Sequence, residues 1–146
     1  MRRRREDTER REGSIRVNGK YTHKNIAEVD DAAAAFGHGE SQEARFATDA
    51  YDAEDTGFSF HRVKPGKRQG FGHRHDIAEE VYFVVSGSGR MKLDDDVLEL
   101  VERDVIRVSP GVTRAFEAGE DGLDVLAFGA RRPEDKGELI QGWWQD

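Results

Sequence analysis

The sequence predicts an all-β domain, either a β-sandwich or a closed barrel, from three observations. Seven apolar segments of strand length follow one another beyond Thr56. Residues with turn chemistry, chiefly glycine, proline and aspartate, separate these segments. The chain has 146 residues, which is enough for one hydrophobic core and too few for two comfortable ones. Short strands at this spacing are typical of sandwiches and barrels, so we expect a single all-β unit.

The N-terminal part is expected to form two segments ahead of the β unit. Residues 1–20 are interpreted as a disordered charged tail, because positions 1–12 hold six arginines, four acidic residues and nothing apolar after Met1. Residues 21–55 are interpreted as an arm with one short helix and an edge strand. The helix is predicted at the alanine run 32–35, which follows Asp31 in the N-cap position and precedes Gly37.

The β unit itself is expected over residues 56–129. Turns are predicted where glycine, proline or aspartate cluster, at residues 65–66, 86–89, 94–96, 110–111 and 119–122. The predicted strands are residues 58–63, 80–85, 90–93, 97–100, 105–108, 113–116 and 123–128.

The C-terminal segment, residues 130–146, is polar until it reaches an apolar end with Trp143 and Trp144. Exposed tryptophan pairs are rare without a partner. We therefore expect this tail to pack on the barrel or on a neighbouring subunit.

Composition and motifs exclude several functional classes. The formal net charge of −7 argues against a nucleic-acid-binding face, which needs clustered basic residues. No cysteine is present, so any metal must be held by nitrogen and oxygen atoms. The chain lacks an apolar run long enough for a membrane span, and it lacks a phosphate-binding glycine loop or a serine nucleophile elbow. A soluble cytoplasmic protein is the resulting expectation.

One cluster, residues 73–80, carries metal-ligand chemistry. In a strand, His73 and His75 share a face because side chains alternate with a period of two. Glu79 and Glu80 point to opposite faces, so only one of them can join the two imidazoles. Two histidines and one carboxylate form a facial triad suited to a divalent first-row metal.

This stretch resembles the first conserved motif of the cupin superfamily. The matching residues are Pro65-Gly66, His73, His75, Glu80 and Gly87, and the spacing to Gly87 selects Glu80 as the third ligand. The resemblance covers about residues 56–129 and implies a small single-domain cupin of the conserved-barrel type, with a jelly-roll or double-stranded β-helix barrel. It also implies a metal ion, Fe, Mn, Ni or Zn, and a homodimer.

Arg114 stands where the family's second motif would place a fourth ligand histidine. A guanidinium group cannot coordinate a metal. One hypothesis is that His73, His75 and Glu80 hold the metal while Arg114 orients an anionic substrate, as in an oxygenase or isomerase. The alternative is a cupin without metal that binds or senses a small molecule, with Arg114 pairing with Glu80 or anchoring an acid group.

Strand alternation indicates further side chains of the site. If Glu80 faces inward, Tyr82 and Val84 do too, and Arg114 brings Phe116 with it. Tyr82 is a candidate general acid/base as well as a candidate barrel aromatic. The pattern does not decide which face of the preceding strand points into the cavity. Gln69 is expected at the cavity mouth. The remaining candidate pocket residues are therefore His61, Phe60 and Gln69.

Overall fold

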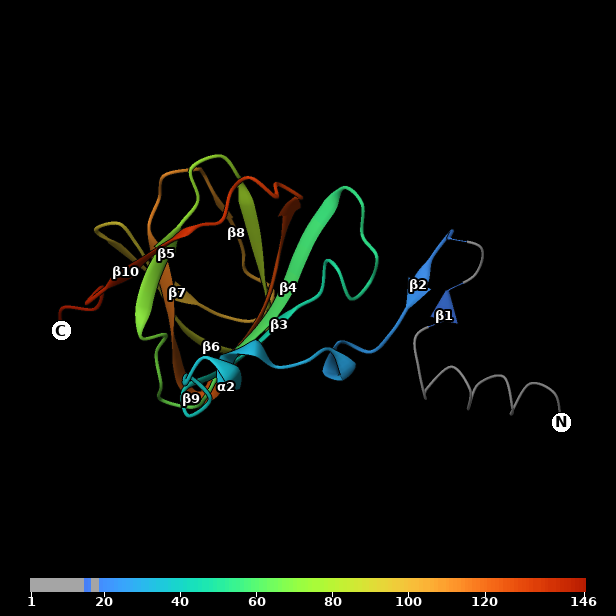
Figure 1. Ribbon diagram of the computed structural model, residues 1–146. Coiled ribbons are helices and arrows are strands. Elements are labelled where there is room, and N and C mark those ends of the chain that lie inside the picture. The colour runs from blue at the N-terminus through green and yellow to red at the C-terminus, as the bar shows by residue number, and fades with distance from the viewer. Residues whose placement is uncertain (1–14, 17–18) are drawn as a thin grey trace, which may run out of the picture.

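The computed structural model describes residues 15–16 and 19–146 (Figure 1). Most of the segment interpreted as a tail, residues 1–14 and 17–18, lies outside the described residues. The first described strand, β1 (Ile15–Arg16), pairs antiparallel with β2 (Thr22–His23). In Figure 1 this pair lies apart from the main body of strands.

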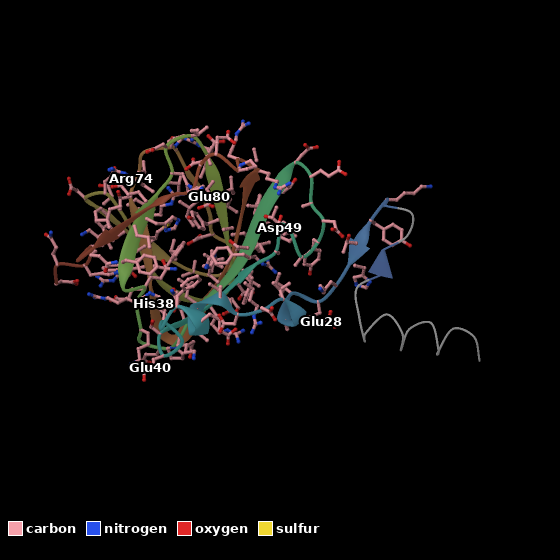
Figure 2. The ribbon with its side chains drawn as sticks, in the orientation of Figure 1. Glu28, His38, Glu40, Asp49, Arg74 and Glu80 are labelled. Carbon is pink, nitrogen blue, oxygen red and sulfur yellow. The ribbon has the colours of Figure 1, made fainter. Side chains whose placement is uncertain are left out.

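The main body is a curled eight-stranded antiparallel sheet, which confirms the all-β jelly-roll barrel. The long strand β9 organises it, because β9 pairs with β4, β5 and β6 at different positions along its length. Side chains fill the space between the strands (Figure 2). The strands are β3 (Gln42–Phe46), β4 (Thr56–Val63), β5 (Phe71–Arg74), β6 (Glu80–Leu93), β7 (Asp96–Leu100), β8 (Val105–Val108), β9 (Arg114–Ala130) and β10 (Glu138–Gln141).

Two predicted turns, at residues 86–89 and 119–122, are wrong. Strands β6 and β9 run through these positions and pair with each other, with register shifts between Val84 and Ser86 and between Gly87 and Gly89. Gly87 has a φ of 81°, and a Cβ there would overlap the carbonyl oxygen of Gly122. The glycines therefore allow two strands to bend and approach closely, as at a β-bulge.

The predicted N-terminal helix is confirmed as α2 (Ala32–Ala35), preceded by the short 3₁₀ helix η1 (Ile26–Glu28). The Asp31 carboxylate accepts the backbone N–H of Ala33 at 2.9 Å and so caps the helix. The same oxygen accepts the N–H of Ala44 at 3.0 Å, which ties the helix to β3. This contact places α2 at one end of the barrel, where it lines the cavity described below.

The hydrophobic core fills the other part of the barrel interior. It contains fully buried aliphatic and aromatic side chains from β4, β6, β8 and β9, including Val84, Met91, Phe116, Leu123 and Val125. The cavity described below lies at the end of the barrel near α2, β3 and β5.

The C-terminal segment packs on the barrel of its own chain. Strand β10 pairs with β5 antiparallel, and the two run side by side in Figure 1. The indole ring of Trp143 lies against Gly72, and the Trp144 Nε1–H donates to the carbonyl of Gln69 at 2.9 Å. No helix among the described residues is long and apolar enough to cross a membrane.

Candidate metal centre and cavity

Strand β5 and the residues after it carry the two candidate histidine ligands. His73 lies opposite Arg114 of β9 and opposite Leu139 of β10, so strands on both sides hold it in place. His75 follows the end of β5, and its ring contacts that of His73 edge-to-face, with centroids 5.5 Å apart.

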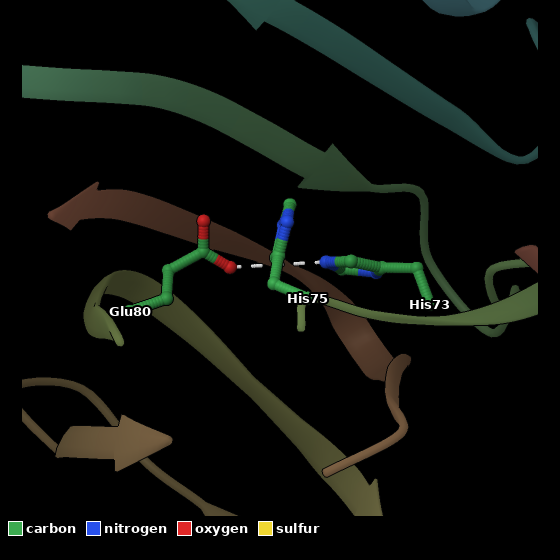
Figure 3. A group of neighbouring side chains, drawn as sticks. All are labelled: His73, His75 and Glu80. Carbon is green, nitrogen blue, oxygen red and sulfur yellow. Dashed lines mark ion pairs between the residues drawn. The ribbon is translucent and has the colours of Figure 1, made fainter. Parts of the chain in front are cut away.

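Glu80, the first residue of β6, brings the carboxylate to the two imidazoles. One donor atom each of His73, His75 and Glu80 lies within 4.8 Å of the other two. Figure 3 shows the Glu80 carboxylate and the His73 ring pointing toward one another, and Glu80 Oε1 is 3.7 Å from His73 Nε2. The structure therefore brings together the three residues that the sequence selected.

Arg114 is fully buried and forms an ion pair with the Glu80 carboxylate. Its Nη2–H donates to Glu80 Oε1 at 2.8 Å, its Nε–H to the Tyr82 hydroxyl at 3.1 Å, and its Nη1–H to the carbonyl of Val112 at 2.9 Å. The Tyr82 hydroxyl in turn donates to Glu80 Oε1. Each of the three guanidinium nitrogens of Arg114 therefore donates to an acceptor within the protein.

These contacts shift the pKa values of the site. Burial raises the pKa of Glu80, but the contact with His73 and the hydrogen bonds from Tyr82 and Arg114 outweigh it and hold the pKa well below its usual range. Burial, with Arg114 nearby, lowers the pKa of His73, which favours the neutral ring that metal binding requires. Burial and the Glu80 charge raise the pKa of Tyr82 well above its usual value. At neutral pH, Glu80 is therefore an anion and Tyr82 a neutral donor.

The site opens into a cavity of about 810 Å³ between α2, β3, β4, β5 and the loop after β9. A cavity of this size accommodates a small organic molecule. Its walls are largely apolar, with Phe46, Phe58, Phe71 and Leu139 among them, and Phe46 and Leu139 are exposed at its opening.

His61, Gln69 and Tyr82 all line this cavity, Gln69 as a buried residue of the wall and not at the mouth, where the sequence predicted it. Burial lowers the pKa of His61 to about 4, and its Nε2 is 2.8 Å from the Ser59 hydroxyl. Ser59 and His61 of β4 therefore both face the cavity, a choice between strand faces that the sequence pattern did not decide. Gln69 is buried, and its Oε1 accepts the N–H of Phe116, so it supports the wall from within.

Four further predicted placements need correction. Phe60 does not line the cavity, whereas its neighbours in β4, Ser59 and His61, do. Val84 and Phe116 do point into the barrel, but they lie in the packed core beyond the cavity. Arg114 is absent from the cavity wall as well, and its guanidinium instead contacts Glu80 and Tyr82, which do line the cavity.

Sequence reasoning missed Asp135, a carboxylate in the loop between β9 and β10. Its Oδ1 lies 3.3 Å from His75 Nδ1, and its Oδ2 accepts the N–H groups of Ile77 and Ala78 at 2.8 and 2.7 Å. No motif in the sequence marks Asp135, because it comes 60 residues after His75 in a polar segment without periodicity.

The donor set fits a divalent first-row metal ion. Bonds of about 2.1 Å to a common ion place neighbouring donor atoms about 3 to 4 Å apart, so the three side chains need only a small inward movement. Asp135 Oδ1 lies 3.3 Å from Nδ1 of His75, and a carboxylate beside the second ring nitrogen of a ligand histidine is common around metal sites. Opposing this, the Arg114 charge beside the site disfavours a further cation.

Comparison with known proteins identifies the family. Residues 59–128 match the family described as a cupin domain. None of the curated proteins matches the sequence. Similar solved structures include a cupin protein from Bacteroides fragilis, with 20% identity and a TM-score of 0.62 over 87% of this chain and 98% of that one.

Two enzymes share the fold at similarly low identity. A cupin-superfamily sugar phosphate isomerase from Silicibacter pomeroyi is 20% identical, with a TM-score of 0.57 over 64% of this chain and 62% of that one. Oxalate decarboxylase from Bacillus subtilis is 16% identical, with a TM-score of 0.64 over 92% of this chain and 34% of that one. The chain thus spans about a third of the decarboxylase. On its fold, its motif and the match over residues 59–128, the chain belongs to the cupin superfamily.

Proposed function

We propose that this cupin binds a divalent metal ion on His73, His75 and Glu80, together with a small anionic organic molecule in the adjoining cavity. The observation that carries this proposal is the convergence of the three donor atoms within 4.8 Å at the surface of an 810 Å³ cavity. Fe, Mn, Ni and Zn all suit two imidazoles and a carboxylate. Such an ion would supply Lewis-acid or redox chemistry to a molecule in the cavity, as in an isomerase or an oxygenase.

The residues around the ligands have supporting roles in this proposal. Arg114 and Tyr82 keep Glu80 ionised and fix its orientation. The neutral rings of His61 and His73 add no positive charge to the site. The Arg114 charge still opposes a cation, so an anion bound with the metal would offset this repulsion and strengthen metal binding.

The nature of the molecule follows from the walls and the opening of the cavity. Apolar side chains form most of the wall, which favours a molecule with an apolar body. Arg132 and Lys136 lie at the exposed edge, and neither forms an ion pair within the part of the chain that the structure describes. Two such cations favour a carboxylate or phosphate. Sugar phosphates and oxalate, which the names of the two similar enzymes mention, are also anions.

The metal part is tested by elemental mass spectrometry after reconstitution with Mn, Fe, Ni and Zn in turn. We expect about one equivalent in the wild type and its loss in His75→Ala. His38→Ala is the matched control, because His38 lines the same cavity but packs against Phe71 instead of the ligand group. No bound metal in the wild type under any of these conditions would refute the proposal.

The ligand part is tested with 4-phenylbutyrate and its uncharged counterpart 4-phenylbutanol, by calorimetric titration. The acid is expected to bind more tightly than the alcohol, and this preference should fall in the double variant Arg132→Gln/Lys136→Gln. Arg131→Gln is the control, because Arg131 is exposed beside the same loop but does not line the cavity. Equal binding of both probes to the wild type would count against an anionic ligand.

A second candidate function is binding or sensing of a small molecule without metal. The specific observation in its favour is the buried Arg114–Glu80 ion pair, in which the guanidinium already neutralises the carboxylate. It predicts that probe binding is unchanged by a chelator and that no metal is retained. The homodimer and the cytoplasmic location stay predictions, and sedimentation velocity giving a monomer at micromolar concentration would contradict the former.

A further inference from the structure

Asp135 is a buried loop carboxylate with four polar partners, His75, Ile77, Ala78 and Gly137. Its side chain is only 3% exposed. Besides the two N–H groups of Ile77 and Ala78, it accepts the N–H of Gly137 at 3.3 Å. Asp135 is therefore an anion that can only accept hydrogen bonds.

This anion constrains the ring of His75. Oδ1 of Asp135 and Nδ1 of His75 are 3.3 Å apart. Because the carboxylate offers no proton, the contact is a hydrogen bond only if Nδ1 carries one. A neutral imidazole holds a single proton, so Nε2 then keeps its lone pair. The pairing selects the tautomer in which Nε2 is free to bind a ligand.

The position of Asp135 is fixed by the strand that follows it. Strand β10 pairs with β5, with Leu139 opposite His73 and Glu138 opposite Arg74. The loop between β9 and β10 therefore lies next to β5 and its histidines, His73 and His75. It lies beyond the residues 59–128 that match the cupin domain, so this contribution to the site comes from outside the shared domain.

We propose that Asp135 is the positioning residue of His75, holding its Nδ1–H toward the C-terminal loop and its Nε2 toward Glu80 and the cavity. The C-terminal segment is then part of the functional site and does more than cover β5. The consequence for metal binding rests on the proposed function, whereas the consequence for the tautomer of His75 does not.

The experiment measures the ring nitrogens of His75 by long-range ¹H–¹⁵N correlation in chelator-treated protein at pH 8, assigned with His75→Gln. The wild type is expected to show the Nδ1–H tautomer. In Asp135→Asn the side-chain oxygen can still accept from the loop, but its NH₂ group would donate to Nδ1. We therefore expect a shift of His75 toward the Nε2–H tautomer in this variant.

The matched control is Glu138→Gln, which lies three positions away and removes only the exposed ion pair with Arg74. It should leave the tautomer of His75 unchanged. A wild-type ring protonated at Nε2, or the same tautomer in the wild type and in Asp135→Asn, would overturn the proposal. The wild-type measurement decides even if Asp135→Asn does not fold.

Zn²⁺ titration against a competing chelator separates the two proposals. Asp135→Asn is expected to lower the affinity for Zn²⁺ by tenfold or more, as loss of a carboxylate behind a ligand histidine commonly does, while Glu138→Gln does not. Equal affinities of the wild type and Asp135→Asn would overturn the positioning role alone. Absence of Zn²⁺ binding in the wild type would instead count against zinc as the metal of the proposed function, with the tautomer still testing Asp135.

Discussion

Replacing Arg114 by methionine tests whether the buried guanidinium supports Glu80. Methionine keeps much of the side-chain volume but removes the hydrogen bonds to Glu80, Tyr82 and the carbonyl of Val112. Breaking a buried ion pair by removing one partner costs about 3 to 5 kcal/mol. Because Glu80 keeps 22% of its side chain exposed, water can solvate part of the stranded carboxylate. We expect the lower end, about 3 kcal/mol.

Urea unfolding of four proteins measures this effect: wild type, Arg114→Met, Glu80→Gln and the double variant. In the double variant the stranded charge is gone, so the loss should be smaller than the sum of the two single losses by about 2 kcal/mol. A loss below about 1 kcal/mol in Arg114→Met, or strict additivity of the two substitutions, would refute the reasoning.

Two further predictions concern the cavity and the C-terminal segment. Burial lowers the pKa of His61 to about 4 in the folded chain, against an ordinary value of 6.5. Between these two pH values the unfolded chain binds a proton at His61 that the folded chain does not, so the free energy of unfolding falls as pH is lowered from 6.5 to 4. Over about 2.5 pH units at about 1.4 kcal/mol per unit, this loss of stability is at most ~3.5 kcal/mol. Urea unfolding at several pH values should show that this loss is missing in His61→Gln, and an identical pH profile of the two proteins would contradict the prediction. A Cβ at Gly72 would lie 2.8 Å from the Trp143 ring, so Gly72→Ala should displace that ring and shift tryptophan emission to longer wavelength. Gly70→Ala, whose Cβ meets nothing within 4 Å, should leave the emission unchanged, and the same spectrum for both variants would contradict the packing.

Much of the fold and the ligand group could be predicted because each depends on local patterns. The two-residue period of strands places His73 and His75 on one face, and the motif spacing distinguishes Glu80 from Glu79. The cap residue Asp31 and the alanine run after it determine the short helix. These signals need no knowledge of distant contacts.

The missed features depend on contacts between distant segments. The inward face of β4 follows from its register with β3 and β9, which pattern alone did not reveal for Phe60 and His61. Whether Arg114 faces a ligand or a buried carboxylate depends on Tyr82 and Glu80 of another strand. A glycine that the sequence pattern assigns to a turn can instead lie inside a strand where two strands approach closely, as Gly87 does.

We propose above all that a metal ion binds among His73, His75 and Glu80 while Arg114 stays hydrogen-bonded to the Glu80 carboxylate. The most direct measurement is anomalous diffraction from a crystal of the Zn²⁺-loaded protein. We expect one strong anomalous peak between the three side chains, with the Arg114–Glu80 hydrogen bond retained. No peak at this position, or an Arg114 side chain displaced into the cavity by the ion, would contradict it.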